Sequence, residues 1–116
     1  MFVVQFFITA SGRKPVQEFI LDQDEQAQEK LYEVLGYFQE FGFHLPTTYL
    51  RRMSGSKRLW ELRAKSRSQQ YRIFVAKVSD QTIVLLHAII KKTAKTPRRD
   101  IETAEDRLRL SQEGAL

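Results

Sequence analysis

The sequence predicts an α+β fold in which a small, mainly antiparallel β-sheet packs against an N-terminal helical hairpin and a C-terminal helix. Apolar residues recur at helical spacing in residues 15–41 and 97–108, and they alternate with a period of two in residues 50–78. The segment Thr82–Ile90 is apolar on both faces, which is typical of a central strand covered from both sides. We expect residues 1–116 to form one domain, because a chain of this length can bury a single core.

The N-terminal part predicts a strand followed by two helices. Residues 2–8 are apolar but too few to span a membrane, so we interpret them as a strand that joins the sheet. Pro15 suits the first position of a short helix. A longer helix should begin after Asp24 and end near Gly42. The inward positions share helical spacing: Val16, Phe19 and Ile20 in the short helix, and Ala27, Leu31, Val34, Leu35, Phe38 and Phe41 in the long one.

The remainder predicts three antiparallel strands and a closing helix. We expect the strands and the turns between them at residues 57–65, 66–69, 70–78, 79–81 and 82–90. Thr96 is the expected N-cap of the closing helix and Pro97 its first residue. Ile101, Ala104 and Leu108 then lie on one face of that helix and should point into the core.

A two-residue connection at Arg67-Ser68 would fix the register of the first hairpin. Trp60 then lies on an apolar face and packs into the core, and Arg63 lies directly opposite Arg72 on the other face. Like charges placed opposite each other on a sheet repel, so we expect both arginines to be exposed and to serve an anionic ligand.

The second hairpin should bring more functional side chains to the same face. A two-residue loop at residues 79–80 would place His87 opposite Arg72. Lys91 would then share their face, and Lys92 would lie at the fraying end of the strand.

The charge is strongly segregated along the chain. Residues 1–50 hold 3 basic and 7 acidic side chains, residues 51–99 hold 14 and 2, and residues 100–116 hold 2 and 5. A basic block of this kind favours a polyanionic partner, and the alternative is an ordinary solvated basic surface. The cations that we expect to bind RNA are Arg51, Arg52, Lys57, Arg58, Lys65, Lys95, Arg98 and Arg99.

The composition argues against several classes of site. The sequence has no cysteine and only two histidines, so disulfides are excluded, a zinc site is improbable, and a reducing cytoplasm suits the chain. It has no arrangement typical of acyl transfer and no phosphate-binding glycine loop. The basic block contains only Glu61 and Asp80 as acids, too few for a pair of metal ions. We expect no metal, no cofactor and no membrane association.

Phosphate chemistry on RNA fits this set of residues. RNA carries its own nucleophile, the 2′-hydroxyl, so cleavage needs alignment, charge stabilisation and a base. Arg63 and Arg72 can stabilise charge on the phosphoryl oxygens. The base could be Glu61, His87 or a lysine whose pKa is lowered by its cationic neighbours. The alternative for His87 is a satisfied core residue, and the alternative for Glu61 is an ion pair with Arg63 or Lys65.

Several segments together resemble one protein family. They are Gly12-Arg13-Lys14-Pro15-Val16 with Phe19, Leu59-Trp60-Glu61-Leu62-Arg63, Tyr71-Arg72-Ile73-Phe74, Leu85-Leu86-His87-Ala88-Ile89-Ile90-Lys91-Lys92-Thr93, and Lys95-Thr96-Pro97 with Ile101 and Ala104. Over nearly the whole chain this combination resembles the phage Gp49-like branch of the RelE/HigB toxin superfamily. The resemblance implies a RelE-like fold and a type II toxin that cuts messenger RNA on the translating ribosome.

The resemblance also implies a partner and site residues. The partner is a cognate antitoxin, usually a helix-turn-helix DNA-binding protein, which silences the toxin. By position, Arg63, Arg72 and the pair Lys91-Lys92 match the RNA-handling residues of the family. We expect a metal-independent endoribonuclease whose products carry a 2′,3′-cyclic phosphate or 3′-phosphate upstream and a 5′-hydroxyl downstream.

A second class of function stays open. The same superfamily contains toxins that poison gyrase, and a prophage protein could keep the basic fold without cleaving RNA. Such a non-catalytic protein would bind nucleic acid or gyrase and would leave an RNA footprint without breaks.

Overall fold

The computed structural model describes residues 1–113. The strands are β1 (Val3–Phe6), β2 (Leu50–Arg52), β3 (Trp60–Ser66), β4 (Gln69–Lys77) and β5 (Thr82–Ile90). The helices are α1 (Pro15–Leu21), α2 (Glu25–Phe41), the 3-10 turn η1 (Gly42–His44) and α3 (Arg98–Glu113). One sheet has the order β1-β5-β4-β3-β2, in which β1 runs parallel to β5 and all other neighbours are antiparallel. The predicted α+β fold with a mixed sheet is therefore confirmed.

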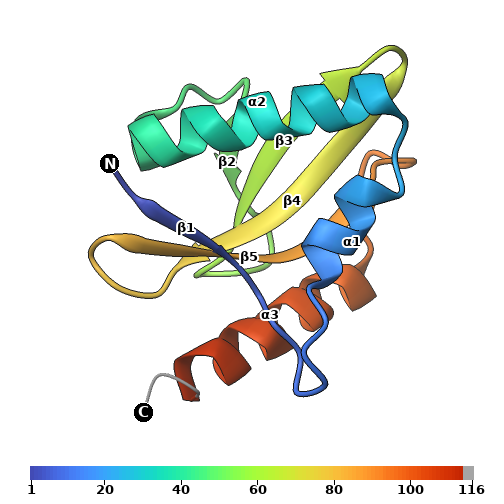
Figure 1. Ribbon diagram of the computed structural model, residues 1–116. Helices are drawn as coiled ribbons and strands as arrows, with labels where there is room; N and C mark the ends of the chain where they lie inside the picture. The colour runs from blue at the N-terminus through green and yellow to red at the C-terminus, as the bar shows by residue number, and fades with distance from the viewer. Residues whose placement is uncertain (114–116) are drawn as a thin grey trace.

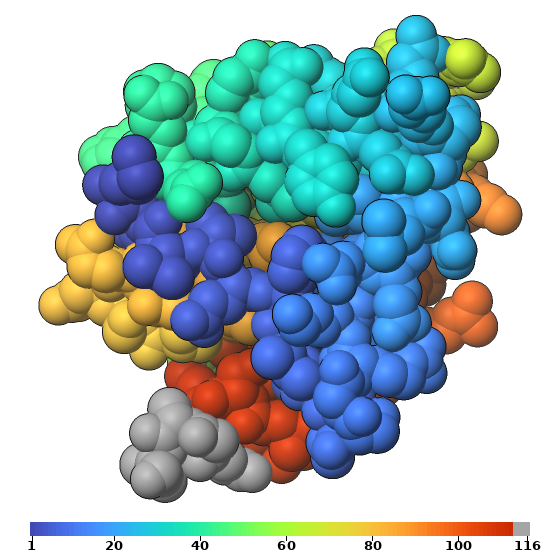
Figure 2. Space-filling view, in the orientation of Figure 1, coloured from blue at the N-terminus to red at the C-terminus, as the bar shows by residue number. Residues whose placement is uncertain are grey.

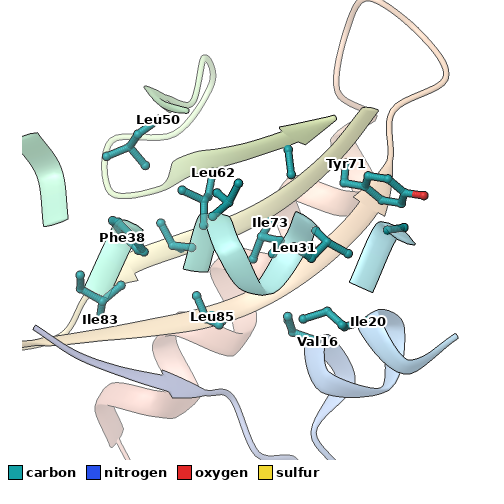
Figure 3. Packing of buried hydrophobic residues seen from close by; sticks show 14 residues of the cluster. Val16, Ile20, Leu31, Phe38, Leu50, Leu62, Tyr71, Ile73, Ile83 and Leu85 are labelled. Atoms are coloured by element: carbon teal, nitrogen blue, oxygen red, sulfur yellow. The ribbon is translucent and has the colours of Figure 1, made fainter. Parts of the chain in front are cut away.

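The helices α1 and α2 cover one face of the sheet, and α3 covers the other (Figure 1). Val16 and Ile20 of α1 and Leu31 and Phe38 of α2 point toward the strands (Figure 3). Burying an apolar side chain of this size contributes about 1.5–3 kcal/mol, so this face supplies much of the stability of the fold. The N-terminal segment closes the same side between α2 and the turn from β4 to β5 (Figure 2). The strand side chains that meet these helices are Leu50, Leu62, Ile73, Val75, Ile83 and Leu85.

The helix α2 begins and ends where the sequence predicts. The carboxylate of Asp24 accepts a hydrogen bond of 2.8 Å from the first turn, and Gly42 follows the last helical residue with a φ of +56°. The inward placement predicted for Phe41 is wrong, because its side chain is 49% exposed. The chain turns at Gly42, and Phe43 packs against Phe38 in its place.

Strand β5 serves both faces of the sheet, as predicted for a central strand. Its residues divide by alternation, with Ile83 and Leu85 toward α1 and α2 and with Val84 and Leu86 toward α3. On the α3 side they meet buried residues that the helical spacing also predicts, namely Ile101, Ala104 and Leu108. The sheet therefore separates two apolar clusters, one shared with α1 and α2 and the other shared with α3.

The start of α3 differs from the prediction by one residue. The carbonyl of Pro97 accepts hydrogen bonds from the backbone N–H groups of Asp100 and Ile101, at 3.1 and 3.4 Å. Pro97 therefore occupies the position just before the helix, which had been predicted for Thr96. Within residues 1–113, no helix combines the length and the apolar character needed to cross a membrane.

The first hairpin has the predicted register, with Arg63 opposite Arg72 across a two-residue loop at Arg67-Ser68. Arg67 has a φ of +56°, a conformation that is uncommon for residues other than glycine. Its Nε donates a hydrogen bond of 2.6 Å to Oε1 of Gln26 at the start of α2. This hydrogen bond holds the turn at Arg67-Ser68, whose backbone conformation is otherwise unfavourable, against α2.

The segment before this hairpin contains a short strand that the prediction did not include. Strand β3 begins at Trp60, three residues later than expected, and residues 53–59 form a loop closed by a hydrogen bond from the Met53 N–H to the Leu59 carbonyl (3.0 Å). Ahead of this loop, β2 pairs with the first three residues of β3 and forms one edge of the sheet.

The register predicted for the second hairpin is wrong. A two-residue loop would pair Lys77 with Thr82, but Lys77 pairs with Ile83, so the loop is one residue longer. Leu86 is then left over at a β-bulge, which shifts the pairing by one residue more. His87 consequently lies opposite Phe74 and not opposite Arg72, whose partner on β5 is Ile89.

Candidate nucleic-acid interface

A half-buried carboxylate, Glu61 of β3, lies among cations. Its Oε1 atom is 2.7 Å from Nε of Arg72 on β4 and 3.6 Å from Nε of Arg63 two residues along the same strand. On its other side, Arg51 of β2 is the paired residue. We call Arg51, Glu61, Arg63, Arg72 and Lys91 the cation cluster, because one carboxylate here faces four positive charges.

Arg72 is buried, and the prediction that it is exposed is wrong. Its side chain is 2% exposed, against 23% for Arg63 opposite it. The guanidinium donates to the Tyr71 carbonyl at 3.2 Å and to Oε1 of Gln70 at 2.7 Å. Its Nε lies close to Glu61 but is not aligned for a hydrogen bond. Burial lowers the pKa of Arg72 from its ordinary value, and Glu61 opposes that shift.

The difference between the two arginines follows from their strands. Arg72 lies on β4, which has neighbours on both sides, whereas β3 has only the short β2 beyond it. Arg63 N–H donates to the Tyr49 carbonyl on the β2 side (2.7 Å), so Arg63 and Arg72 form a pair without hydrogen bonds between them. In antiparallel sheets such pairs bring the two Cα atoms closest together, so the two side chains start close to each other.

Lys91 directly follows β5 and completes the cluster. Its N–H donates to the Gln70 carbonyl at 2.7 Å, which fixes the start of its side chain beside Arg72. Burial lowers the pKa of Lys91, the charge of Arg72 lowers it further, and Glu61 opposes both effects. The prediction that Lys91 shares the face of Arg72 is therefore correct, even though the register that led to it was shifted.

A cleft of about 720 Å³ opens beside the cation cluster. We call it the first cleft; it lies between β2, the segment after β5 and the start of α3. Glu61 is the one acidic residue among its lining residues, so the cleft favours an anionic ligand. Its lining includes the cluster members Arg51 and Lys91 and the predicted RNA-binding residues Arg52, Lys95 and Arg98.

Lys92, predicted as a catalytic residue, and the remaining predicted RNA-binding residues lie around this cleft or apart from it. Lys92 and Arg99 line a smaller neighbouring pocket together with Lys91 and Lys95. Arg58 donates a hydrogen bond of 2.8 Å to Oε1 of Gln112 on α3. The loop residue Lys57 is exposed, and its carbonyl accepts a hydrogen bond of 2.9 Å from Arg52. Lys65 lies in a different cleft, described below.

His87 is outside the cation cluster. Its Nε2 is 2.8 Å from Oδ1 of Asp100, and its Nδ1 is 3.3 Å from a guanidinium nitrogen of Arg107, both on α3. Arg107 also donates to the Leu86 carbonyl at 2.9 Å, and burial lowers the pKa of Arg107. Because a guanidinium only donates, Nδ1 accepts and the proton on Nε2 points to Asp100. Both ring nitrogens of His87 therefore serve to fasten α3 to β5.

Two features of the site were missed by the sequence analysis. Gln70 was not singled out, although it holds Arg72 through its side chain and Lys91 through its carbonyl. The predicted register already placed Gln70 next to Arg72, so this role could have been found. The second missed feature is Arg51 as the strand partner of Glu61, because β2 is too short to give a periodic signal. Within residues 1–113, no three or more histidine and carboxylate side chains gather in a way that could hold a metal ion.

A family profile matches most of the chain. The profile of the family described as phage-derived protein Gp49-like matches residues 18–109, which is more than three quarters of the chain. The matched segment contains every residue of the cation cluster. No curated protein matches the chain.

Proposed function

Since the chain belongs to the phage-derived Gp49-like family, which points to proteins of the toxin–antitoxin kind, we propose that it is a toxin that cleaves messenger RNA on the ribosome. The observation that carries this proposal is the cation cluster, in which one carboxylate lies among four cations and, together with Arg51 and Lys91, lines the first cleft. An RNA phosphate would enter that cleft and compete with Glu61 for the positive charges.

The buried and the exposed arginine suit different parts of the reaction. Arg72 is held by Gln70, Tyr71 and Glu61, so its charge is fixed in place before a substrate arrives. Donors that are oriented in advance stabilise developing charge most effectively. Arg63 is the more exposed of the two and can move onto a phosphoryl oxygen. We assign to both the stabilisation of charge in the transition state.

In this proposal Glu61 and Lys91 carry out the two proton transfers. Glu61 is the acidic residue lining the cleft, so it is our choice as the base that takes the proton of the 2′-hydroxyl. Lys91 has a lowered pKa and can give a proton to the departing 5′-oxygen. The 2′-oxygen bonds to phosphorus as the bond to the 5′-oxygen breaks, which leaves a 2′,3′-cyclic phosphate and a 5′-hydroxyl. No metal ion takes part in this scheme.

A second function, nucleic-acid binding without cleavage, is favoured by one observation. Arg72 is 2% exposed, its two terminal nitrogens already donate to Tyr71 and Gln70, and its Nε faces Glu61, so a phosphate can reach it only if Glu61 moves. If Glu61 stays paired, the cluster would bind an anion through Arg51, Arg63 and Lys91 without driving a reaction. This alternative includes a toxin that binds another nucleic-acid enzyme such as gyrase.

The proposed partners are messenger RNA on the ribosome, in the cytoplasm, and a cognate helix-turn-helix antitoxin. An antitoxin that covers the first cleft with an acidic segment would neutralise its charge and exclude RNA. Its binding should then weaken as salt rises.

The experiment is induction of the chain in a bacterial host, with and without the neighbouring open reading frame, while the ends of messenger RNA are mapped. We expect new ends with 5′-hydroxyl chemistry inside coding regions, and we expect co-expression of the neighbouring frame to abolish them. Purified translating ribosomes should reproduce the cuts, and DNA should stay intact because it lacks the 2′-hydroxyl. New ends with 5′-phosphate would contradict the mechanism, and RNA protection without breaks would establish the non-catalytic alternative.

A further inference from the structure

A second basic cleft lies at the open edge of β3. It measures about 660 Å³ and is lined by Arg63 and Arg72, neither of which lines the first cleft. No acidic residue is among the residues that line it. These are Lys30, Thr48, Tyr49, Arg63, Ala64, Lys65, Arg67, Gln70 and Arg72.

The edge of the sheet here offers backbone groups as well as charge. Strand β2 pairs with Trp60, Glu61 and Leu62, and within residues 1–113 no strand pairs with the outer edge of β3 beyond that point. The N–H of Arg63 points away from β4, toward the Tyr49 carbonyl. Backbone direction repeats every second residue in a strand, so the N–H and carbonyl of Lys65 also point outward, into the second cleft. One residue with two free groups is too short an edge to pair with a strand of another protein, but it suits a single nucleotide.

The cations of the second cleft differ in how firmly they are held. The side chain of Lys65 is exposed and makes no ion pair within the described residues. Lys30 is paired with Glu33 at 3.5 Å, an exposed contact of the kind that is worth little and is readily exchanged. Arg67 is fastened to Gln26 and lies 3.9 Å from a carboxylate oxygen of Asp24. Lys65 and Lys30 are therefore the charges most free to meet a phosphate.

The two clefts meet at the cation cluster. Arg63 and Arg72 line the second cleft, and both contact Glu61, which lines the first. From Glu61 to Lys65 the strand advances about 13 Å, a span that several nucleotides of an extended chain can cover. Tyr49 forms a wall of the second cleft and is already packed edge-on against Tyr37, so recognition there depends on charge and on the backbone edge.

We propose that the second cleft is a separate phosphate-binding subsite for single-stranded RNA, in which Lys65, Lys30 and the free backbone of Lys65 hold nucleotides that lie several positions from the reacting phosphate. This inference rests on the proposed function, because it takes the cation cluster as the place of cleavage. The strand of RNA then follows β3 from the first cleft, across Arg63, to the second.

The test compares short and long RNA on matched variants. Single-stranded RNA that is 2′-O-methylated throughout cannot be cleaved, and lengths of about 4 and about 12 nucleotides distinguish one cleft from two. Binding is measured by fluorescence anisotropy over a series of salt concentrations for the wild-type chain and for the double variant Lys30→Gln with Lys65→Gln. The matched control is Lys77→Gln, which removes an exposed charge at the other end of β4 and touches neither cleft.

We expect the double variant to weaken binding of the long RNA roughly tenfold and to reduce the slope of log K against log salt by about 1.4, the value for two lost phosphate contacts on a single strand. The short RNA should bind the variant and the wild type alike, and Lys77→Gln should leave both lengths unchanged.

Three results would overturn the inference. The first is an unchanged affinity of the double variant for long RNA, and the second is an equal loss of affinity for both RNA lengths. The third is a loss of affinity for the antitoxin with no loss of affinity for RNA. The last would assign the second cleft to a protein partner. The outcome is separable from the proposed function. Binding to both clefts without any cleavage would support the second cleft as a subsite and exclude the nuclease. Cleavage together with an unchanged affinity of the double variant for long RNA would support the nuclease and exclude the subsite.

Discussion

Arg63 and Arg72 lie directly opposite each other on β3 and β4, yet the side chain of one is 23% exposed and that of the other is 2% exposed. Both contact the same carboxylate oxygen of Glu61. Two arginines that form one pair in the sheet therefore differ in their expected response to mutation.

Replacing Arg63 with alanine should leave the fold intact and remove most of the activity. A lost charge contact to the transition state costs on the order of 3 kcal/mol, or about a hundredfold in rate. Cleavage on translating ribosomes and the melting temperature are the two measurements, with Lys77→Ala as the control for loss of a positive charge. Full activity of Arg63→Ala would remove this residue from the mechanism.

The variant Arg72→Ala should instead lower stability, because it leaves Glu61 half-buried without its closest partner. Breaking a buried ion pair by removing one member costs about 3 kcal/mol. Urea unfolding of the variant gives this free energy directly. The variant Arg72→Lys keeps the charge and separates the loss of charge from the loss of the guanidinium contacts. A melting curve of Arg72→Ala equal to that of the wild type would show that the burial is unimportant for folding.

Replacing Lys91 with arginine should separate binding from proton transfer. Arginine keeps the positive charge but gives up its proton far less readily than lysine, so binding of uncleavable RNA should stay within about twofold while cleavage falls about a hundredfold. Loss of binding and of cleavage in parallel would show that Lys91 only holds the phosphate.

The cleavage rate should depend on pH through the protonation state of Lys91. If Lys91 donates a proton, the rate is retained below the pKa of Lys91 and is lost as the pH rises through it. Because burial and Arg72 lower that pKa, the decline should begin below about pH 10, the ordinary range for lysine. The measurement is single-turnover cleavage across that range. A rate that stays constant throughout would exclude Lys91 as the acid.

Gln70 is expected to act through the residues that it positions. Its side-chain oxygen accepts from Arg72 and its carbonyl accepts from Lys91, each at 2.7 Å. Gln70→Ala removes only the first contact, so cleavage should drop about tenfold with little change in RNA affinity. The neighbouring exposed residue gives the control, Gln69→Ala. Equal behaviour of the two variants would mean that Arg72 is held sufficiently by its other contacts.

His87 is expected to matter for stability and not for chemistry. His87→Ala breaks the hydrogen bonds to Asp100 and Arg107, which should cost about 1–3 kcal/mol of unfolding free energy. The cleavage rate per folded molecule should be unchanged, and Asp100→Ala should show the same pattern. Loss of cleavage in a fully stable His87 variant would return this residue to the list of candidate bases.

The sequence predicted the first hairpin more accurately than the second for a physical reason. A two-residue loop permits one register of β3 against β4, and the apolar alternation from Trp60 to Ala64 agrees with that register. The second hairpin combines a longer loop with a bulge at Leu86, and apolar residues on both faces of β5 give no alternation that would reveal either. Together the two shifts amount to an even number, which is why Lys91 still falls on the predicted face.

The burial of Arg72 could not be predicted in the same way. Alternation identifies the face on which a residue lies, but exposure depends on what the rest of the chain places over that face. Here Glu61, Gln70 and the segment at Lys91 enclose the guanidinium. These contacts come from β3, from β4 and from the end of β5, so the guanidinium is enclosed only when all three strands are paired.

The parallel pairing of β1 with β5 has a consequence for the order in which the chain can fold during synthesis. Val3 pairs with Thr82, so β1 cannot join the sheet until the chain has been made as far as β5. Lys91 and all of α3 follow later still. A nascent chain therefore has no complete sheet until β5 has been made, and no assembled cation cluster until Lys91 has left the ribosome.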